Sequence, residues 1–114
     1  MRILVCGGRN YNDYEQMREV LFQNVYPGDT IIHGDARGAD KLSEEVAQPY
    51  VTFERYPANW SEYGKSAGYV RNKLMLEQGK PDLVIAFPGG KGTANMVELA
   101  TKANIPVRYI NGHN

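Results

Sequence analysis

The sequence predicts an α/β fold, namely a single Rossmann-like three-layer domain in which helices cover both faces of a parallel sheet. Two observations support this prediction. Short apolar segments typical of buried strands alternate with segments whose apolar residues recur at helical spacing. Glycine-rich turns follow three of the apolar segments, where a strand would end and a helix begin. The 114 residues suffice for one core, so we expect one domain over residues 1–114.

Five segments are expected to be strands because each is short, apolar or β-branched, and bounded by turn residues. They cover residues 2–6, 30–33, 50–56, 82–87 and 105–110. Strands that alternate strictly with helices form parallel sheets, because each crossover places a helix on one face. With five strands, the expected order is 3-2-1-4-5.

Four helices are expected between these strands. They cover residues 14–25, 39–47, 67–79 and 92–103. Asp13 and Gln16 have the spacing of an N-cap pair at the start of the first helix. Pro49 ends the second helix. Residues 57–65, "PANWSEYGK", are expected to form a polar and aromatic loop.

Composition restricts the possible partners and compartment. The 13 basic and 13 acidic side chains cancel, which counts against a nucleic-acid partner but leaves a local basic patch open. One cysteine allows no internal disulfide and fits a reducing cytoplasm. The apolar run in "MRILVCGG" is too short for a signal peptide, and no segment has the length to span a bilayer. We therefore expect a cytoplasmic protein without a membrane partner.

The glycine-rich turns should meet at one edge of the sheet. "GGRN" follows the first strand, "GDARGAD" the second and "PGGKGT" the fourth. In the expected order, the first and fourth strands flank the switch point, where open α/β sheets bind ligands. Glycine lets a ligand approach the backbone, and a helix start offers free N–H groups to an anion. The sequence thus predicts a phosphate site, although a tight turn without a ligand is an alternative.

The "PGGKGT" turn differs from two common nucleotide motifs. A P-loop needs lysine directly before serine or threonine, but Gly92 separates Lys91 from Thr93. A dinucleotide fingerprint would need glycine or alanine where Asn95 stands. These departures count against a nucleoside triphosphatase and an ordinary NAD dehydrogenase, and no cofactor is predicted.

Four motifs resemble those of the SLOG superfamily, which includes the DNA-processing protein family and the Lonely Guy nucleotide phosphoribohydrolases. They are "GGRNY", "HGDARGAD", "GYVRNKLM" and "PGGKGT". The resemblance is greatest to the small YspA-like branch of bacteria and phages, and it covers nearly the whole chain. It implies a Rossmann-like fold and a nucleotide-derived ligand, such as a nucleoside monophosphate or an ADP-ribose derivative. Because relatives are often dimers, it also implies a homo-oligomer.

The resemblance leaves the catalytic acid in question. In Lonely Guy enzymes, a glutamate three residues after the motif threonine helps to cleave the N-glycosidic bond, but Met96 stands there in this chain. Glu98 lies about 200° further around a helix and should point elsewhere. Arg71 matches the family's arginine, whereas Asn72 replaces its lysine. The binding residues are thus kept while the acid is lost or relocated, with Asp35 and Glu98 as the catalytic candidates.

The residues expected to bind the ligand come from the glycine-rich turns and from the helix before the fourth strand. They are Gly7, Gly8, Arg9, Gly34, Asp35, Arg71, Asn72, Pro88, Gly89, Gly90, Lys91, Gly92 and Thr93. Arg9 and Arg71 either pair with phosphate or are merely solvated. Trp60 and Tyr63 either stack on a base or fill the core or a subunit contact.

The remaining polar candidates have structural explanations. Cys6 is expected to be a buried apolar residue and His33 a hydrogen-bonded histidine at a strand end. Asp40 is expected to brace the second helix, with a site role as the alternative. His113 belongs to the C-terminal tail, and no metal site is predicted.

Three functions remain open. The first is a sensor or sequestering protein that binds a nucleotide-derived small molecule through the glycine-rich turns. The second is a Lonely Guy-like N-glycosidase that uses another acid. The third is a single-stranded DNA binder, with stacking and basic contacts from Trp60, Tyr63, Tyr69, Lys65 and Arg71.

Overall fold

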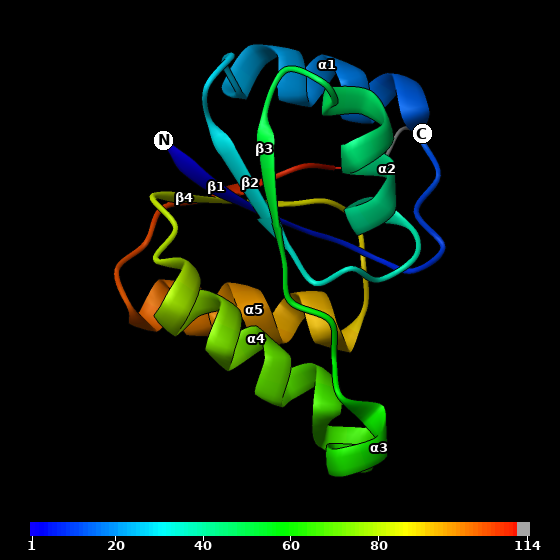
Figure 1. Cartoon of the computed structure of the whole chain (residues 1–114), viewed down its shortest axis with the longest axis vertical. Coiled ribbons are helices and arrows are strands. Elements are labelled where there is room, and N and C mark those ends of the chain that lie inside the picture. The colour runs from blue at the N-terminus through cyan, green and yellow to red at the C-terminus, as the bar shows by residue number, and fades with distance from the viewer. Residues whose placement is uncertain (112–114) are drawn as a thin grey trace.

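The computed structural model of the chain describes residues 1–111, so His113 lies outside the described residues. Five parallel strands form one sheet in the order β3-β2-β1-β4-β5, which confirms the predicted fold class and strand order (Figure 1). The strands are β1 (Arg2–Cys6), β2 (Thr30–His33), β3 (Thr52–Arg55), β4 (Leu83–Ala86) and β5 (Val107–Tyr109). Strands β3, β4 and β5 are shorter than predicted, and among the residues left out Tyr50 lies in a turn while Val51 and Asp82 lie in bends.

Helices cover both faces of the sheet. They are α1 (Tyr14–Asn24), α2 (Ala39–Ala47), α3 (Trp60–Tyr63), α4 (Ala67–Gly79) and α5 (Lys91–Lys102), with a 3₁₀ turn at Gly64–Ser66. Helices α1 and α2 pack on one face, and α4 and α5 pack on the other (Figure 1). The predicted cap is present, since the Asp13 carboxylate accepts a hydrogen bond from the Gln16 amide at 3.1 Å.

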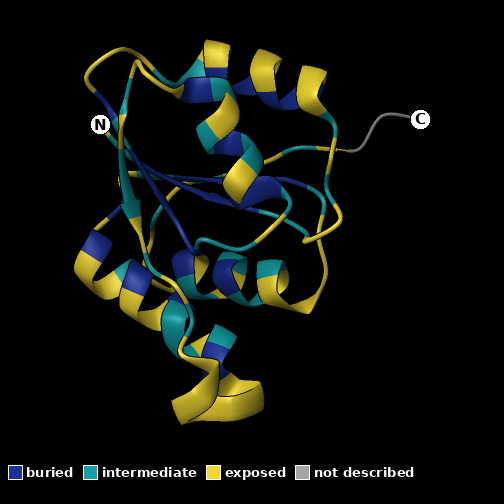
Figure 2. Ribbon diagram, turned by 45° about the vertical axis from the view of Figure 1, so that its right-hand side comes forward, coloured by how far each residue is buried: buried dark blue, intermediate teal, exposed yellow. Residues whose placement is uncertain are grey.

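The prediction of a loop over residues 57–65 was wrong in part, because α3 and the 3₁₀ turn lie within it and extend to Ser66. The Asn59 side chain caps α3 by accepting a hydrogen bond from the Glu62 amide at 3.1 Å. A four-residue helix is too short to show an apolar period, so the sequence pattern missed it. The segment is exposed and projects beyond the amino-terminal end of α4 (Figure 2).

The central strands supply two cores, one on each side of the sheet. In β1, Ile3 and Val5 face the helices α1 and α2, while Leu4 and Cys6 face α4 and α5. Both sets are buried, as expected for a parallel strand covered on both faces (Figure 2). No helix among residues 1–111 is long and apolar enough to cross a bilayer.

Three turns are joined at the carboxyl edge of the sheet. The Gly8 amide after β1 donates to the Pro88 carbonyl after β4 at 2.9 Å. The Gly8 carbonyl accepts from the Ala39 amide at the start of α2, at 3.1 Å. The β1 turn is thus fixed between the start of α2 and the turn that leads into α5.

Replacement of Gly38 by alanine should destabilise the fold at this junction. Gly38 has a φ of +83°, and a Cβ there would overlap the Gly8 carbonyl and the Arg9 backbone. We expect Gly38→Ala to lower the free energy of unfolding by about 2–4 kcal/mol, measured by urea denaturation.

Gly28→Ala is the matched control, because Gly28 also has a positive φ but a Cβ there would meet no atom within 4 Å. It should cost only about 1 kcal/mol. Equal losses in the two variants would contradict a role for the contact with Gly8.

Candidate ligand-binding site

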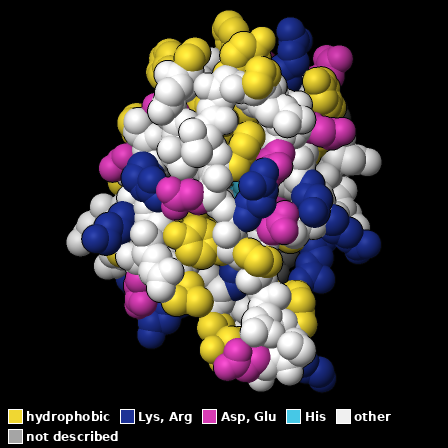
Figure 3. All heavy atoms as spheres, viewed as in Figure 1, with side chains coloured by type: hydrophobic (Ala, Val, Ile, Leu, Met, Phe, Trp, Pro, Cys, Tyr) yellow, Lys and Arg dark blue, Asp and Glu magenta, His cyan; other side chains and the backbone are white. Residues whose placement is uncertain are grey.

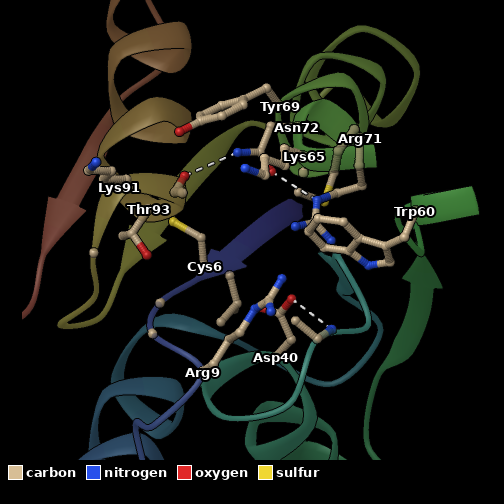
Figure 4. Close-up of a pocket in the computed structure, with 18 residues that line it drawn as sticks. Cys6, Arg9, Asp40, Trp60, Lys65, Tyr69, Arg71, Asn72, Lys91 and Thr93 are labelled. Atoms are coloured by element: carbon tan, nitrogen blue, oxygen red, sulfur yellow. Dashed lines mark hydrogen bonds between the residues drawn. The ribbon is translucent and has the colours of Figure 1, made fainter. Parts of the chain in front are cut away.

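A cavity of about 390 Å³ lies at the carboxyl ends of β1 and β4, between the starts of α4 and α5 (Figure 4). Its walls come from the β1 turn, the start of α2, the α3 segment and the first turns of α4 and α5. Ten of the predicted site residues line it. They are Gly7, Gly8, Arg9, Trp60, Arg71, Asn72, Gly90, Lys91, Gly92 and Thr93. This volume is in the range of small-molecule sites.

The start of α5 forms an open wall of the cavity. Gly90 is the N-cap and supplies no side-chain cap, so the first amides of the helix have no partner within it. A Cβ on Gly90 or Gly92 would meet no atom within 4 Å. The backbone is therefore exposed to an incoming group, and the positive end of the helix dipole favours an anion there.

Asn72 connects the opposite wall to α5. Its side-chain amide donates to the Gly92 carbonyl at 3.1 Å, and its Oδ1 accepts from Arg71 Nε at 3.0 Å (Figure 4). The same amide also donates to Asn95 Oδ1 at 3.0 Å. Only 4% of Asn72 is exposed. Both amide protons are thus used within the protein, and Asn72 holds Arg71 and the α5 start in position.

Arg71 is held from its other side by Gly34. Arg71 Nη1 donates to the Gly34 carbonyl at 2.7 Å, and a Cβ on Gly34 would overlap the guanidinium. Burial lowers the pKa of Arg71, while the nearby Asp40 carboxylate opposes that shift. Since the guanidinium has five N–H donors, others remain for a ligand. Gly34 therefore contributes to the site by holding the Arg71 side chain in position.

Asp40 braces the turn between β2 and α2, in agreement with one of its two expected roles. Its Oδ2 accepts a hydrogen bond from the Gly34 amide at 3.0 Å. It also accepts one from the Ala36 amide at 3.3 Å (Figure 4). Burial raises the pKa of the carboxyl, whereas His33, these amides and Arg71 favour its charged form. Asp40 also lines the cavity, where basic groups predominate.

Arg9 and Trp60 close one side of the cavity. The Arg9 guanidinium carbon lies 5.0 Å from the centroid of the Trp60 ring, in a cation–π contact between the β1 turn and α3. Trp60 is 49% exposed, so part of the ring remains available. Tyr63, the other stacking candidate, is exposed and is not one of the described residues that line this cavity.

The other predicted residues lie beside the cavity. Gly34 and Asp35 line an adjoining pocket, and Pro88 and Gly89 line grooves on the far side of the β4 turn. Glu98 faces the groove between α5 and β5 and pairs with Lys102 at 2.9 Å. It points away from the cavity, as its helical spacing predicted.

Met96 and Cys6 belong to the core beneath the cavity. Met96 is 0% exposed and packs in the cluster that contains Leu4 and Ile32. The Cys6 thiol lines the cavity floor, and burial raises its pKa to about 12, with a contribution from Asp40. A neutral thiol is a poor nucleophile, which agrees with the structural role expected for Cys6.

His33 is fully hydrogen-bonded, as expected. Its Nε2 lies 2.7 Å from Glu44 Oε1, and its Nδ1 accepts from the Asp35 amide at 3.0 Å. His33, Asp35 and Glu44 have ligand atoms within 4.8 Å of one another, a cluster that their sequence separation did not reveal. Arg55 also binds Glu44, and this hydrogen bond and that from His33 lower the Glu44 pKa. A metal ion here would have to displace these bonds.

Several cavity residues were not among the predicted ligand contacts. Gly68 and Met75 lie on the same face of α4 as Arg71 and Asn72, at spacings of three and four residues. That spacing could have identified them from the sequence. Lys65 and Tyr69 also line the cavity, and the sequence suggested both as nucleic-acid contacts.

The sequence was compared with family models and with known proteins, and both comparisons found a match. Residues 1–63 match the family model described as "YspA, cpYpsA-related SLOG family". The Gene 61 protein of Mycobacterium phage D29 is 36% identical over an alignment of 118 positions, which covers 93% of each chain. The family match spans the turns after β1 and β2, and the alignment with the phage protein extends over almost the whole chain.

Introducing a glutamate at position 96 should damage the fold without creating an active site. Met96 is fully buried, so Met96→Glu would place a carboxyl in an apolar core. We expect a loss of about 3 kcal/mol or more in unfolding free energy by urea denaturation.

Met96→Leu is the control, because a similar volume should cost less than about 1.5 kcal/mol. A stable Met96→Glu variant that releases free base from AMP would show that position 96 can reach a ligand.

Proposed function

The chain belongs to the YspA, cpYpsA-related SLOG family, and we propose that it binds a nucleotide-derived small molecule whose phosphate lies against the start of α5. In this proposal, the protein retains its ligand intact, as a sensor or a sequestering protein. Suitable ligands are nucleoside monophosphates and ADP-ribose-type molecules. Family membership supports a nucleotide-related ligand, and the cavity supports the position of its phosphate.

The observation that carries the proposal is that the open start of α5 shares a cavity with arginine side chains that form no ion pair within residues 1–111. Gly90 and Gly92 leave space at the helix start, and Arg9 and Arg71 come from the opposite walls. No ion pair is formed by Arg9 or Arg71 within residues 1–111. Helix N-termini and guanidinium groups are both strong phosphate ligands.

The acidic groups favour binding over hydrolysis. Cleavage of an N-glycosidic bond needs an acid placed beside the bond. Asp40 is the acid that lines the cavity, and two backbone amides donate hydrogen bonds to its Oδ2. Asp35 lies in the adjoining pocket 3.3 Å from Lys41, and Glu98 faces another groove. An intact bound ligand is therefore the expected state.

Gly90→Leu should abolish phosphate binding while leaving the fold intact. The added side chain would enter open space next to the helix start instead of the core. We expect the affinity for AMP to fall by at least about tenfold, because charge-assisted bonds to the phosphate would be lost. Isothermal titration calorimetry measures the affinity, and thermal denaturation checks the fold.

Ala94→Leu is the matched control, since it adds the same side chain on the exposed face of α5 outside the cavity. It should leave AMP affinity unchanged. Normal binding by Gly90→Leu would refute the phosphate position. Free adenine formed at a catalytic rate in the wild-type mixture would refute a pure binding role and favour the N-glycosidase.

We also propose that the protein self-associates in the cytoplasm. Phe22, Tyr26 and Tyr50 are 85%, 64% and 67% exposed, respectively. They belong to α1 and to the turns at the amino ends of β2 and β3, and hydrophobic side chains gather over this end of the molecule (Figure 3). Aromatic residues are enriched in subunit interfaces, so these three residues form a suitable contact.

Phe22→Ser should shift such an oligomer towards the monomer, as measured by sedimentation equilibrium. The exposed site implies little change in the stability of the monomer itself. A wild-type protein that sediments as a monomer at high micromolar concentration would refute self-association.

A further inference from the structure

We infer that the ligand carries a second phosphoryl group, which binds in the pocket adjoining the cavity. This inference rests on the proposed function, because it assumes that a first phosphate lies at the start of α5. The adjoining pocket, called here the distal pocket, has a volume of about 530 Å³. It is lined by the turn after β2, by Pro57 and Ala58, and by the wall that it shares with the cavity.

The shared wall allows one ligand to reach both compartments. Arg9, Ala36, Trp60 and Arg71 line the cavity on one side and the distal pocket on the other. Arg9 is exposed and lines both compartments, and its guanidinium lies over the face of Trp60. The half-exposed Trp60 ring lies between the two compartments, where a base or ribose could pack against it.

The charges of the distal pocket favour an anion. Arg9, Arg37 and Arg71 line it, and Asp35 is its acidic residue. Lys41 lies 3.3 Å from Asp35 and offsets that negative charge. The chain as a whole has equal numbers of acidic and basic residues, so this excess of arginine is local. Planar guanidinium groups can bind a phosphoryl group through paired hydrogen bonds.

Arg37 is the residue that distinguishes the second site from the first. It is exposed, lines the distal pocket and not the cavity, and forms no ion pair within residues 1–111. Three amides of the same turn are already used within the protein. The Gly34 and Ala36 amides donate to Asp40, and the Asp35 amide donates to His33. We therefore assign the second phosphoryl group to the Arg37 side chain, which lines the distal pocket and not the cavity.

The test compares ligands that differ in their second phosphoryl group. Calorimetry would measure AMP, ADP and adenosine 3′,5′-bisphosphate against the wild type, Arg37→Gln and Arg18→Gln. Arg18 is an exposed residue of α1 that lines neither compartment, so its variant loses the same charge elsewhere. Trp60, the chain's one tryptophan, provides an independent fluorescence signal from the shared wall.

We expect ADP or adenosine 3′,5′-bisphosphate, or both, to bind about tenfold or more tightly than AMP. Arg37→Gln should remove that gain in affinity while leaving AMP affinity within about twofold of the wild type. Arg18→Gln should retain the gain. If AMP binds but neither ligand binds more tightly, or if the gain survives in Arg37→Gln, the second site is refuted and the proposed function stands. If none of the three ligands binds, both fail.

Discussion

The candidate site depends on the hydrogen bonds that fix the β1 turn to its neighbours. The Gly8 amide binds the Pro88 carbonyl, and the Gly8 carbonyl accepts from Ala39. Parallel strands already place their carboxyl ends on one edge of the sheet, but these bonds bring the turns after β1 and β4 and the start of α2 into direct contact. The cavity opens beside this junction, between α4 and α5, and the core residues Cys6 and Met75 line it.

A second set of polar contacts fixes the side chains that form the walls of the cavity. Asp40 holds the Gly34 amide, the Gly34 carbonyl holds Arg71, Arg71 donates to Asn72, and Asn72 donates to the Gly92 carbonyl. This series of hydrogen bonds runs from α2 through the β2 turn and α4 to α5. No buried side-chain polar atom among residues 1–111 lacks a partner. The arginine is therefore ordered before any ligand arrives, which reduces the entropy lost on binding.

The fold could be predicted from the sequence because alternating strands and helices leave few topologies, and the strand order followed from crossover rules. Helix α3 could not, since four residues show no period and its cap depends on Asn59. The site was only partly predictable. A motif places Gly34 and Asn72 near a ligand, but it does not reveal that their polar groups bind Asp40, Arg71 and α5. Such distant partners become visible only when the chain is folded.

The chemistry of the cavity explains why binding and hydrolysis can separate in this fold. Phosphate contacts act equally on the bound ligand and on a transition state, so by themselves they increase affinity without increasing turnover. Cleavage of a glycosidic bond develops positive charge on the sugar, which nearby acids stabilise and nearby cations oppose. This cavity has Arg9, Lys65, Arg71 and Lys91 in its walls against the acid Asp40. Met96, which matches the catalytic glutamate of the similar Lonely Guy enzymes, is buried. Under the proposed function, such a site would stabilise an anionic ligand in its ground state, and the ligand would be retained.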